Sequence, residues 1–343
     1  MGEVLGLGVT HGPYVLYPEA GMAGILRRIL MSPKTPAHLK EPSAWPEPMR
    51  REWGEDQGLS AAHEHRMRLV EGFRRARKAL DDFKPDVVII FGDDQYENFK
   101  EDVVPAFCVF AHDEYRCQPF KSPSGLGGGT ENVWNESGDF ELVMRGAKAI
   151  GKDLATALLH HRIDIAYSYK PLHHPMAHAF WRTVAHLDYD RRGFDYPIIP
   201  FHVNCYGSGF TARMGEDGED PPGPTPARCM EVGAAVARWA RRGGHRVAIV
   251  GSSSWSHAFL TKKHHYLWPD VESDRRRFAE LRAGDYEAWR NIPIEEIEEN
   301  GQHEMLNWMC LAGAMSELGQ TPRQLDFVET WIFNSCKTMA VFG

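Results

Sequence analysis

The chain has 343 residues, of which 43% are hydrophobic, so it can bury a large core in one α/β domain or in two smaller domains. It carries 39 basic and 47 acidic residues, a balance that argues against a general nucleic-acid or membrane-surface binder and favours a small or neutral ligand. No run approaches the roughly 18 apolar residues of a membrane-spanning helix.

The N-terminus and the cysteines indicate a cytoplasmic protein without a disulfide framework. The first residues lack the basic and then apolar layout of a signal peptide. The six cysteines are scattered and form no C-x-x-C pair. We therefore expect structural or incidental thiols rather than zinc ligands or disulfides.

Three apolar runs predict buried strands that end in polar residues. Val4–Thr10 ends in His11, and Asp86–Phe91 is followed by Gly-Asp-Asp-Gln. The run that begins at Val247 ends in glycine and serine and leads to His257. Because the carboxyl ends of parallel strands meet at one edge of a sheet, we expect these polar residues to form a site there.

A strand, helix, strand unit is predicted near the N-terminus. Residues 17–58 are rich in proline and charge and are expected to form an irregular cap or an oligomer contact. A helix is predicted from Ser60, its N-cap, to Phe83. Its apolar face is expected to hold Met67, Val70, Phe73, Ala76 and Leu80. The helix leads into the second strand, as is typical of a parallel sheet.

The middle of the chain combines an irregular stretch with a helix. Residues 100–138 are expected to be irregular. Their glycine-rich run, Ser122–Gly129, is interpreted as a flexible loop, because it follows no strand and carries no Lys-Ser/Thr pair for phosphate binding. Glu141–His161 has the periodicity of a helix.

Three histidines follow the next predicted strand, Ile163–Tyr167. They are His173, His174 and His178, and two prolines stand beside them. This exceeds what core packing needs, so we interpret the histidines as lining a site.

The C-terminal part continues the alternation of strand and helix. Pro197–Val203 predicts a strand, Ala227–Arg242 a helix, and the charged segment up to Glu299 an exposed helical region. Gly301–Glu317 predicts a helix with a buried face, which places Glu304 beside the core. Because an unpaired buried carboxylate is costly, we expect a cation next to Glu304.

A histidine and a carboxylate that meet at a sheet edge suit a divalent metal. Two histidines and one carboxylate form the facial triad of non-haem Fe(II) oxygenases. In this interpretation His11 and Glu304 supply two ligands, and Gln95, Asp94 or Glu97 supplies the third.

Six motifs follow one another along the chain. They are Thr-His-Gly-Pro at 10–13, Gly-Asp-Asp-Gln-Tyr-Glu-Asn-Phe at 92–99, His-His-Pro-Met at 173–176, Ile-Ile-Pro-Phe-His-Val-Asn at 198–204, Ser-Ser-Trp-Ser-His at 253–257 and His-Glu-Met-Leu-Asn-Trp at 303–308. In this order they resemble the class III extradiol ring-cleavage dioxygenases, in particular the catalytic subunit of protocatechuate 4,5-dioxygenase and its relatives. The resemblance covers the whole chain apart from expected insertions at 17–58 and 100–138.

The resemblance implies a single domain over residues 1–343, with an α/β fold whose central mixed, largely parallel sheet is flanked by helices. It implies one Fe(II) and O₂-dependent cleavage of a catechol-type, aminophenol-type or gallate-type ring. His11 and Glu304 fall on iron-ligand positions, His257 on an acid/base position and His174 on a second catalytic histidine. The resemblance also favours a homodimer and leaves room for a small helical partner subunit.

One motif departs from the family pattern, because Gln95 stands where the family has its second iron-ligand histidine. An amide oxygen is a weaker ligand for Fe(II) than imidazole, so we expect lower metal affinity or a different metal. Gln95 itself, Asp94 or Glu97 could complete the site, or the metal could be lost.

Three further residues are expected near the substrate. His178, or alternatively His174, could take a proton from a substrate hydroxyl, and Tyr96 and Trp255 are expected as pocket walls or as ordinary core. A metal-dependent hydrolase and a metal-free binding protein on the same scaffold remain alternatives. This chain keeps His11, His174, His257 and Glu304 at positions of the family's site, and their presence together disfavours the binding protein.

Overall fold

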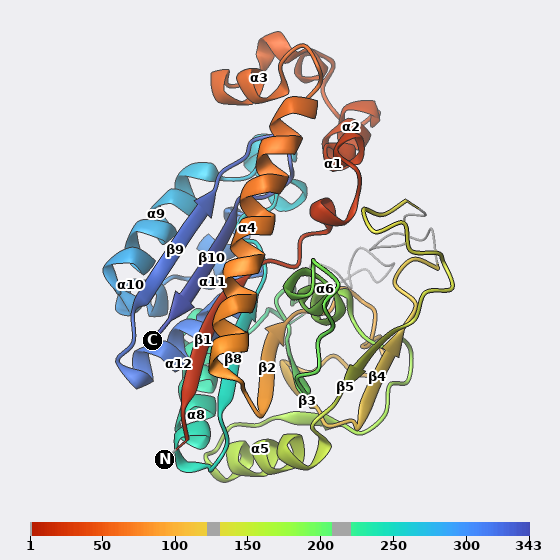
Figure 1. Ribbon diagram of the computed structural model, residues 1–343. Coiled ribbons are helices and arrows are strands. Elements are labelled where there is room, and N and C mark those ends of the chain that lie inside the picture. Colours follow the sequence, from red (N-terminus) through yellow and green to blue (C-terminus); the bar gives the residue numbers. More distant parts are fainter. Residues whose placement is uncertain (1, 122–130, 208–220) are drawn as a thin grey trace.

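A mixed sheet of eight strands runs through the molecule in a computed structural model, which describes residues 2–121, 131–207 and 221–343 (Figure 1). The strand order is β6-β3-β7-β2-β8-β1-β10-β9. Its four central strands are parallel to one another: β7 (Ile198–Val203), β2 (Val87–Gly92), β8 (Val247–Ser252) and β1 (Val4–Val9). The predicted α/β fold with a mixed, largely parallel sheet is therefore confirmed.

Two pairs of strands extend the central four. On one side β10 (Lys337–Phe342) lies antiparallel to β1, and β9 (Pro322–Val328) lies antiparallel to β10. On the other side β3 (Phe107–Phe110) lies antiparallel to β7 and parallel to β6 (Ala166–Ser168). A separate hairpin joins β4 (Glu114–Cys117) to β5 (Leu142–Arg145).

Helices cover both faces of the sheet, which explains why the central strands are continuous apolar runs. Within β2, Val87, Ile89 and Phe91 belong to the larger core cluster, whereas Val88 and Ile90 belong to the second one. The larger cluster includes side chains of α5 (Lys148–His160), α8 (Pro226–Arg242) and α12 (Met305–Leu318). The second includes side chains of α4 (Leu59–Phe83) and α6 (His178–Leu187).

Helices α8 and α12 touch backbone to backbone through two glycines. A Cβ atom on Gly233 would lie 1.8 Å from the carbonyl oxygen of Cys310, and one on Gly313 would lie 2.1 Å from that of Met230. Since real Cβ atoms do not approach so closely, no larger residue fits at either position without moving a helix.

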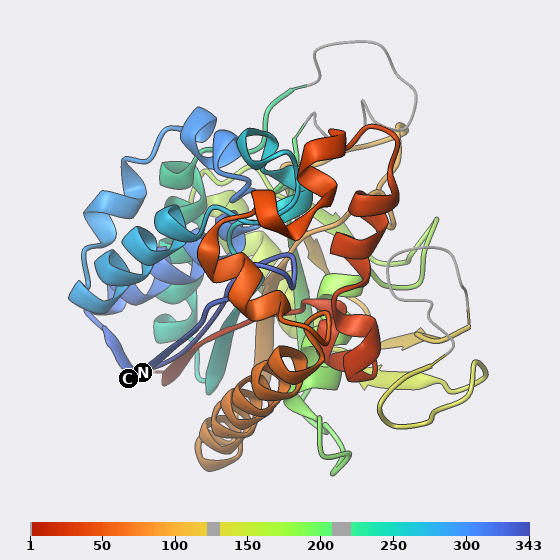
Figure 2. The same cartoon turned by 90° about the horizontal axis from the view of Figure 1, so that it is seen from above.

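Residues 17–58 form a cap of short helices rather than an irregular stretch. The cap contains α1 (Glu19–Met22), α2 (Gly24–Met31) and α3 (Glu47–Trp53), and it lies over one end of the sheet in the view from above (Figure 2). Trp45, Met49 and Trp53 belong to a smaller apolar cluster that the cap shares with Ile332 and Phe333. The cap therefore packs as a satellite of the main core.

The charged segment before α12 is helical, as predicted. It holds α9 (Val271–Ala283), α10 (Tyr286–Arg290) and α11 (Ile294–Glu299). None of the helices in the described ranges combines the length and apolar character that a bilayer crossing requires.

Several predicted boundaries were wrong. The helix expected from Glu141 begins at Lys148, because its first residues form β5 in a hairpin. Residues 100–138 are not wholly irregular, since they contain β3 and β4. Ser122–Gly129 lies outside the described residues.

Two details of α4 also differ from prediction. Gly58, not Ser60, occupies the N-cap, and the Asp56 carboxylate accepts the backbone N–H groups of Gly58, Leu59 and Ser60. Met67, placed on the apolar face, is 61% exposed. The helix needs only a narrow buried face, because it lies on one face of the sheet with its other side towards solvent (Figure 1).

Candidate active site

The ends of three parallel strands meet at the floor of a cavity, where they gather buried polar residues. His11 follows β1, Asp93 and Gln95 follow β2, and His257 follows β8. Two helix starts complete the group. His178 opens α6, and Glu304 stands at the N-cap of α12; all six of these residues are buried.

Two imidazoles face the Glu304 carboxylate in the same manner. His11 Nδ1 is 2.9 Å from the carbonyl oxygen of Ser252, and His257 Nδ1 is 2.9 Å from that of Trp255. A carbonyl only accepts, so each Nδ1 carries a hydrogen, and each Nε2 is the nitrogen that faces Glu304. The two Nε2 atoms lie 3.3 Å and 3.4 Å from Glu304 Oε2.

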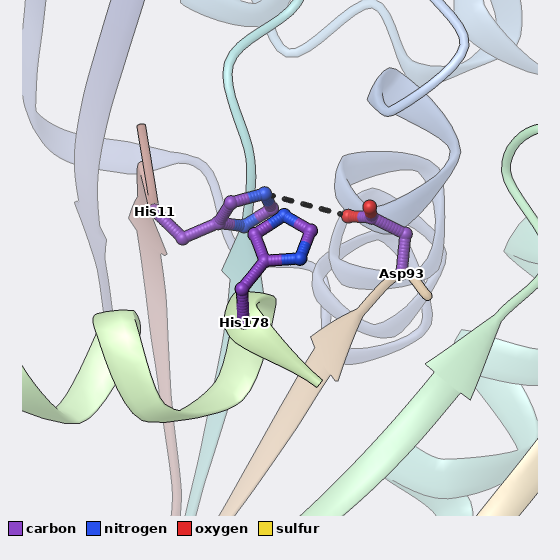
Figure 3. Close-up of side chains that lie close together, drawn as sticks. All are labelled: His11, Asp93 and His178. Atoms are coloured by element: carbon purple, nitrogen blue, oxygen red, sulfur yellow. Dashed lines mark ion pairs between the residues drawn. The ribbon is translucent and has the colours of Figure 1, made fainter. Parts of the chain in front are cut away.

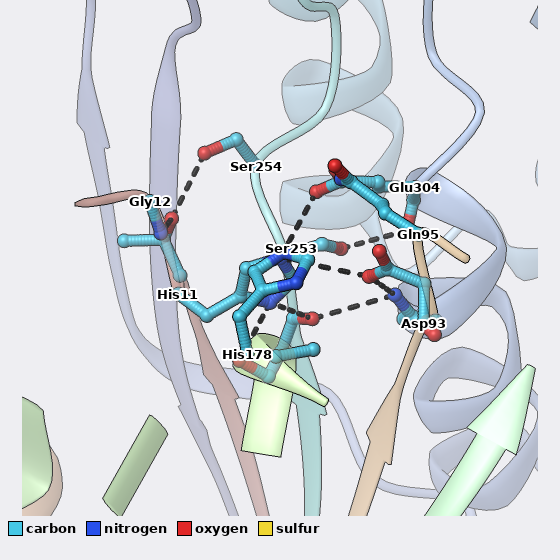
Figure 4. Close-up of polar contacts among 12 residues, drawn as sticks. His11, Gly12, Asp93, Gln95, His178, Ser253, Ser254 and Glu304 are labelled. Carbon is cyan, nitrogen blue, oxygen red and sulfur yellow. Dashed lines mark hydrogen bonds and ion pairs between the residues drawn. The ribbon is translucent and has the colours of Figure 1, made fainter. Parts of the chain in front are cut away.

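A second carboxylate, Asp93, approaches His11 from β2. Asp93 Oδ1 is 3.5 Å from His11 Nε2 and accepts a hydrogen bond of 3.0 Å from Asn307 Nδ2 (Figure 4). The other oxygen, Oδ2, is buried and has no hydrogen-bond partner in the described part of the chain. Burial and the neighbouring charge of Glu304 raise the pKa of Asp93 to about 8.

His178 is oriented by the carboxylate of Glu97. Its Nδ1 lies 2.6 Å from Glu97 Oε2, and its backbone N–H donates to Glu97 Oε1 at 3.0 Å. One potential ligand atom from each of His11, Asp93 and His178 lies within 4.8 Å of the others (Figure 3). The rings of His11 and His178 meet edge to face with centroids 5.1 Å apart.

The other carboxylate oxygen of Glu304, Oε1, accepts hydrogen bonds from two uncharged side chains. Gln95 Nε2 donates to Glu304 Oε1 at 3.0 Å, and the Tyr206 hydroxyl donates to the same oxygen. Gln95 Nε2 also lies 2.7 Å from the Tyr206 oxygen. These contacts fix the carboxylate so that Oε2 faces the histidines.

Burial and charge act in opposite directions on the titration of this group. Burial alone would raise the pKa of Glu304, but His257, His11 and the hydrogen bond from Tyr206 hold it below its ordinary value. Burial lowers the pKa of His257, and Glu304 offsets only part of this effect. Burial also lowers the pKa of His178, with a further contribution from Arg182.

This donor set fits a divalent cation. Two buried carboxylates repel each other, and an ion between them and the free imidazole nitrogens would remove that cost. The unpartnered Oδ2 of Asp93 is the atom that such an ion would satisfy. Imidazole and carboxylate are ligands that suit iron, zinc and manganese.

The structure brings five of the residues singled out in the sequence to one place: His11, Gln95, His178, His257 and Glu304 all line the cavity. The two alternative third ligands are engaged elsewhere. Asp94 accepts the backbone N–H groups of Glu97 and Asn98, and Glu97 binds His178.

Three other sequence-predicted residues do not reach the cavity. His174 is half-buried, and its Nδ1 accepts a hydrogen bond from the Met176 backbone N–H. Tyr96, with a φ of 63°, donates its hydroxyl to Glu101. Trp255 is buried in the core between two other tryptophans, Trp289 and Trp308.

Three site residues were not identified from the sequence as parts of the site. Asp93 directly follows β2, but the sequence alone does not distinguish it from its neighbour Asp94. Arg182 lies four residues after His178, so helical spacing could have placed both on one face. For Tyr206 no local pattern points to Glu304.

The cavity has a volume of 460 Å³ and is closed on one side by the cap. Ile25 and Ile29 of α2 line it as well, together with Tyr14 and Tyr17. It therefore combines an apolar wall with a polar floor, as ligand pockets commonly do.

Curated proteins with similar sequences are aromatic-ring dioxygenases by name. The "2,3-dihydroxyphenylpropionate/2,3-dihydroxicinnamic acid 1,2-dioxygenase 2" of Pseudomonas putida is 29% identical over 239 residues, which cover 68% of this chain and 60% of that protein. The enzyme with the same name but no final number in Paraburkholderia phymatum is 30% identical over 54% of this chain and 47% of its own. That of Cupriavidus necator is 24% identical over 75% of this chain and 85% of its own.

The chain thus spans about half to three-fifths of the length of the first two of these relatives. No family model matches it. Among solved structures, the uncharacterized protein JW3007 of Escherichia coli K12 aligns over 80% of this chain at 12% identity and a TM-score of 0.43, a likeness too distant to identify the fold. The curated relatives confirm the resemblance to the extradiol dioxygenases that the six motifs predicted.

Proposed function

We propose that this chain, whose curated relatives are named as ring dioxygenases, is a non-haem Fe(II)-dependent extradiol dioxygenase. Its substrate would be a catechol-type ring, or an aminophenol-type or gallate-type ring, cleaved with O₂. The observation that carries the proposal is a group of buried carboxylates and histidines. Glu304 lies with His11, His178 and His257 at the floor of a cavity, and the second carboxylate, Asp93, lies 3.5 Å from His11 Nε2 and close to His178.

His11 and Glu304 are the proposed first two metal ligands. For the third, the motif alignment points to Gln95, whereas the geometry favours Asp93, whose Oδ2 has no other partner in the described ranges. We assign the third position to Asp93, because a carboxylate binds Fe(II) more strongly than an amide does. A bound Fe(II) would supply the chelation of both ring oxygens and the redox chemistry with O₂.

His257 is the proposed acid/base residue for the ring hydroxyls. Burial lowers its pKa, so the imidazole is neutral near pH 7, and its Nδ1 hydrogen is bound to the Trp255 carbonyl. Nε2 can therefore accept a proton from a hydroxyl that enters beside Glu304.

His178 is the proposed second proton carrier, in the role that the motifs predicted for His174. Glu97 holds its Nδ1, so its Nε2 is the nitrogen left for the cavity. The Glu97–His178 pair resembles other carboxylate–histidine pairs, in which the acid fixes the tautomer and orientation of the ring.

A metal-dependent hydrolase is the second candidate, and the additional carboxylate of Asp93 favours it. A site with two carboxylates could hold Zn²⁺ or Mn²⁺ and activate water instead of O₂. The homodimer, the small partner subunit and the cytoplasmic location expected from the sequence remain predictions.

One experiment separates these functions. Protein purified without oxygen would be analysed for metal content, and O₂ consumption would be measured on the same sample with a catechol panel that includes 2,3-dihydroxyphenylpropionate. Near-stoichiometric iron with O₂ uptake and a yellow ring-opened product is the expected result. Tightly bound zinc without O₂ uptake would favour the hydrolase, and protein that stays inactive after Fe(II) is added would overturn the dioxygenase.

A further inference from the structure

Arg182 is a buried cation without a counter-ion in the described part of the chain. Its side chain is only 2% exposed, and its Nε and Nη2 atoms have no hydrogen-bond partner there. Its guanidinium lies 5.3 Å from the ring centroid of Trp181, a contact that does not satisfy the N–H groups. A buried guanidinium without partners is expensive, so a ligand that pairs with it would recover a large free energy.

The acidic groups nearest to Arg182 are already engaged. Glu97 binds the ring and backbone of His178, and Glu304 faces His11 and His257. The other groups that interact with its charge are the hydroxyls of Tyr14 and Tyr17. Arg182 therefore makes no direct ion pair within the described ranges.

Arg182 and the proposed catalytic histidine lie on one face of α6. Arg182 follows His178 by four residues, about one helical turn, and both line the 460 Å³ cavity. The cavity lies in the range that holds ligands larger than a bare ring. A ring whose hydroxyls face His257 and Glu304 would leave room for a substituent that points along α6.

We propose that Arg182 binds an anionic substituent, a carboxylate, on the aromatic ring that the site cleaves. Guanidinium and carboxylate match each other in charge and in planar geometry, so they can form two parallel hydrogen bonds. The apolar linker between ring and carboxylate would lie against Ile25 and Ile29 of the cap. This assignment rests on the proposed function. What it adds is a specificity-determining residue, Arg182, for a ring that carries a carboxylate, as the substrates in the names of the curated relatives do.

The test compares three ligands that differ only in the substituent: catechol, a catechol with a carboxyethyl side chain at carbon 3, and the methyl ester of that acid. Wild-type protein should prefer the acid over its ester in kcat/KM. In Arg182→Met, the ratio of kcat/KM for the acid to kcat/KM for its ester should fall on the order of 10- to 100-fold, and this ratio is independent of any effect of the variant on turnover of the ring itself. Arg182→Lys keeps the positive charge but lacks the two parallel N–H donors of a guanidinium, so it should retain part of the preference for the acid over its ester.

A matched control uses the other arginine of the cavity. Arg28 also lines the cavity but is exposed, so water already solvates its charge. Arg28→Gln should leave the preference for the acid unchanged. Loss of the preference in Arg28→Gln, but not in Arg182→Met, would overturn the assignment.

Binding without turnover separates this inference from the proposed function. Calorimetric titration of metal-free protein with 3-phenylpropanoate and with 3-phenylpropanol should show tighter binding of the acid, and Arg182→Met should abolish the difference. If Arg182 binds the acid in this way but no ring is cleaved in the turnover assay, the proposed dioxygenase function is wrong and the anion site still stands. Equal losses for acid, ester and catechol would mean that Arg182 binds an oxygen of the ring itself, and would overturn the proposal.

The wild-type comparison keeps the test decisive if Arg182→Met does not fold. Folding of each variant is checked by circular dichroism. If it fails, equal affinity of the wild-type protein for the acid and the alcohol would by itself overturn the inference.

Discussion

At the scale of single residues, Asp93 and Glu304 are two carboxylates buried beside each other. Their hydrogen bonds come from Asn307, Gln95 and Tyr206, which are all uncharged donors. Glu304 Oε2 and Asp93 Oδ1 lie 3.3–3.5 Å from imidazole Nε2 atoms, so the charge of the group depends on what binds there. The chemistry of each residue can be tested separately.

Replacing Asp93 should weaken metal binding. Asp93→Asn keeps the size and can still contact Asn307, but it removes a negative charge from the group. We expect at least about tenfold lower retention of iron after dialysis against a chelator, measured by elemental analysis.

Asp94→Asn is the matched control for this change. Its carboxylate accepts the backbone N–H groups of Glu97 and Asn98 and does not belong to the group that Asp93 forms with His11 and His178. It should lower stability without changing metal content. Equal metal content in Asp93→Asn and wild type would remove Asp93 from the ligand set.

Replacing Gln95 should have the opposite effect. Gln95→His would place an imidazole, a stronger Fe(II) ligand than an amide, beside Glu304. We expect higher iron retention, measured in the same dialysis. Unchanged iron content would show that this side chain only supports Glu304 through its hydrogen bond.

At the scale of elements, α8 and α12 form the closest helix pair of the core, and they depend on glycine. Gly313→Ala would push a Cβ atom into the carbonyl oxygen of Met230, which lies 2.1 Å from the ideal position. The helices would have to separate, so we expect the free energy of unfolding in urea to fall by about 1–3 kcal/mol.

An exposed glycine provides the comparison. A Cβ atom on Gly244, in the loop after α8, would have no neighbour within 4 Å, and its φ is not positive. Gly244→Ala should therefore change stability by less than about 0.5 kcal/mol. If Gly313→Ala changes the free energy of unfolding as little as Gly244→Ala does, α8 and α12 are not packed as closely as described.

At the scale of the whole molecule, buried neutral histidines make the free energy of unfolding decrease as the pH falls. Burial lowers the pKa of His202 to about 3, whereas an unfolded chain has a value near about 6.5. Between these values the unfolded state binds more protons than the folded state. Stability is therefore lost as pH falls from about 6.5 towards 3.

His202→Gln removes this titration while keeping a donor for the Pro105 carbonyl, to which His202 Nε2 is bound at 3.2 Å. The stability of wild type relative to the variant should fall by at most about 1.4 kcal/mol per pH unit across that window. Urea unfolding at several pH values measures the difference. A difference that does not vary with pH would mean that His202 titrates normally in the folded protein.

The sequence by itself determined the parallel centre of the fold and three residues of the site. Val87 to Phe91 read as a buried strand because both faces of the sheet are covered, and this shows as an unbroken apolar run. His11 and His257 follow such runs directly, and Glu304 starts a helix with a buried face. Local periodicity is enough to place these residues at one sheet edge.

The tertiary structure alone decided which of several similar residues enters the site. Asp93 and Asp94 are identical neighbours, and only the turn after β2 sends one to His11 and the other to backbone N–H groups. The start of α6 likewise selects His178 over His174. Three other features depend on contacts between distant parts of the chain, which no local pattern records. They are the pairing of β9 and β10, the cap over the cavity and the burial of Arg182 without a direct ion pair in the described ranges.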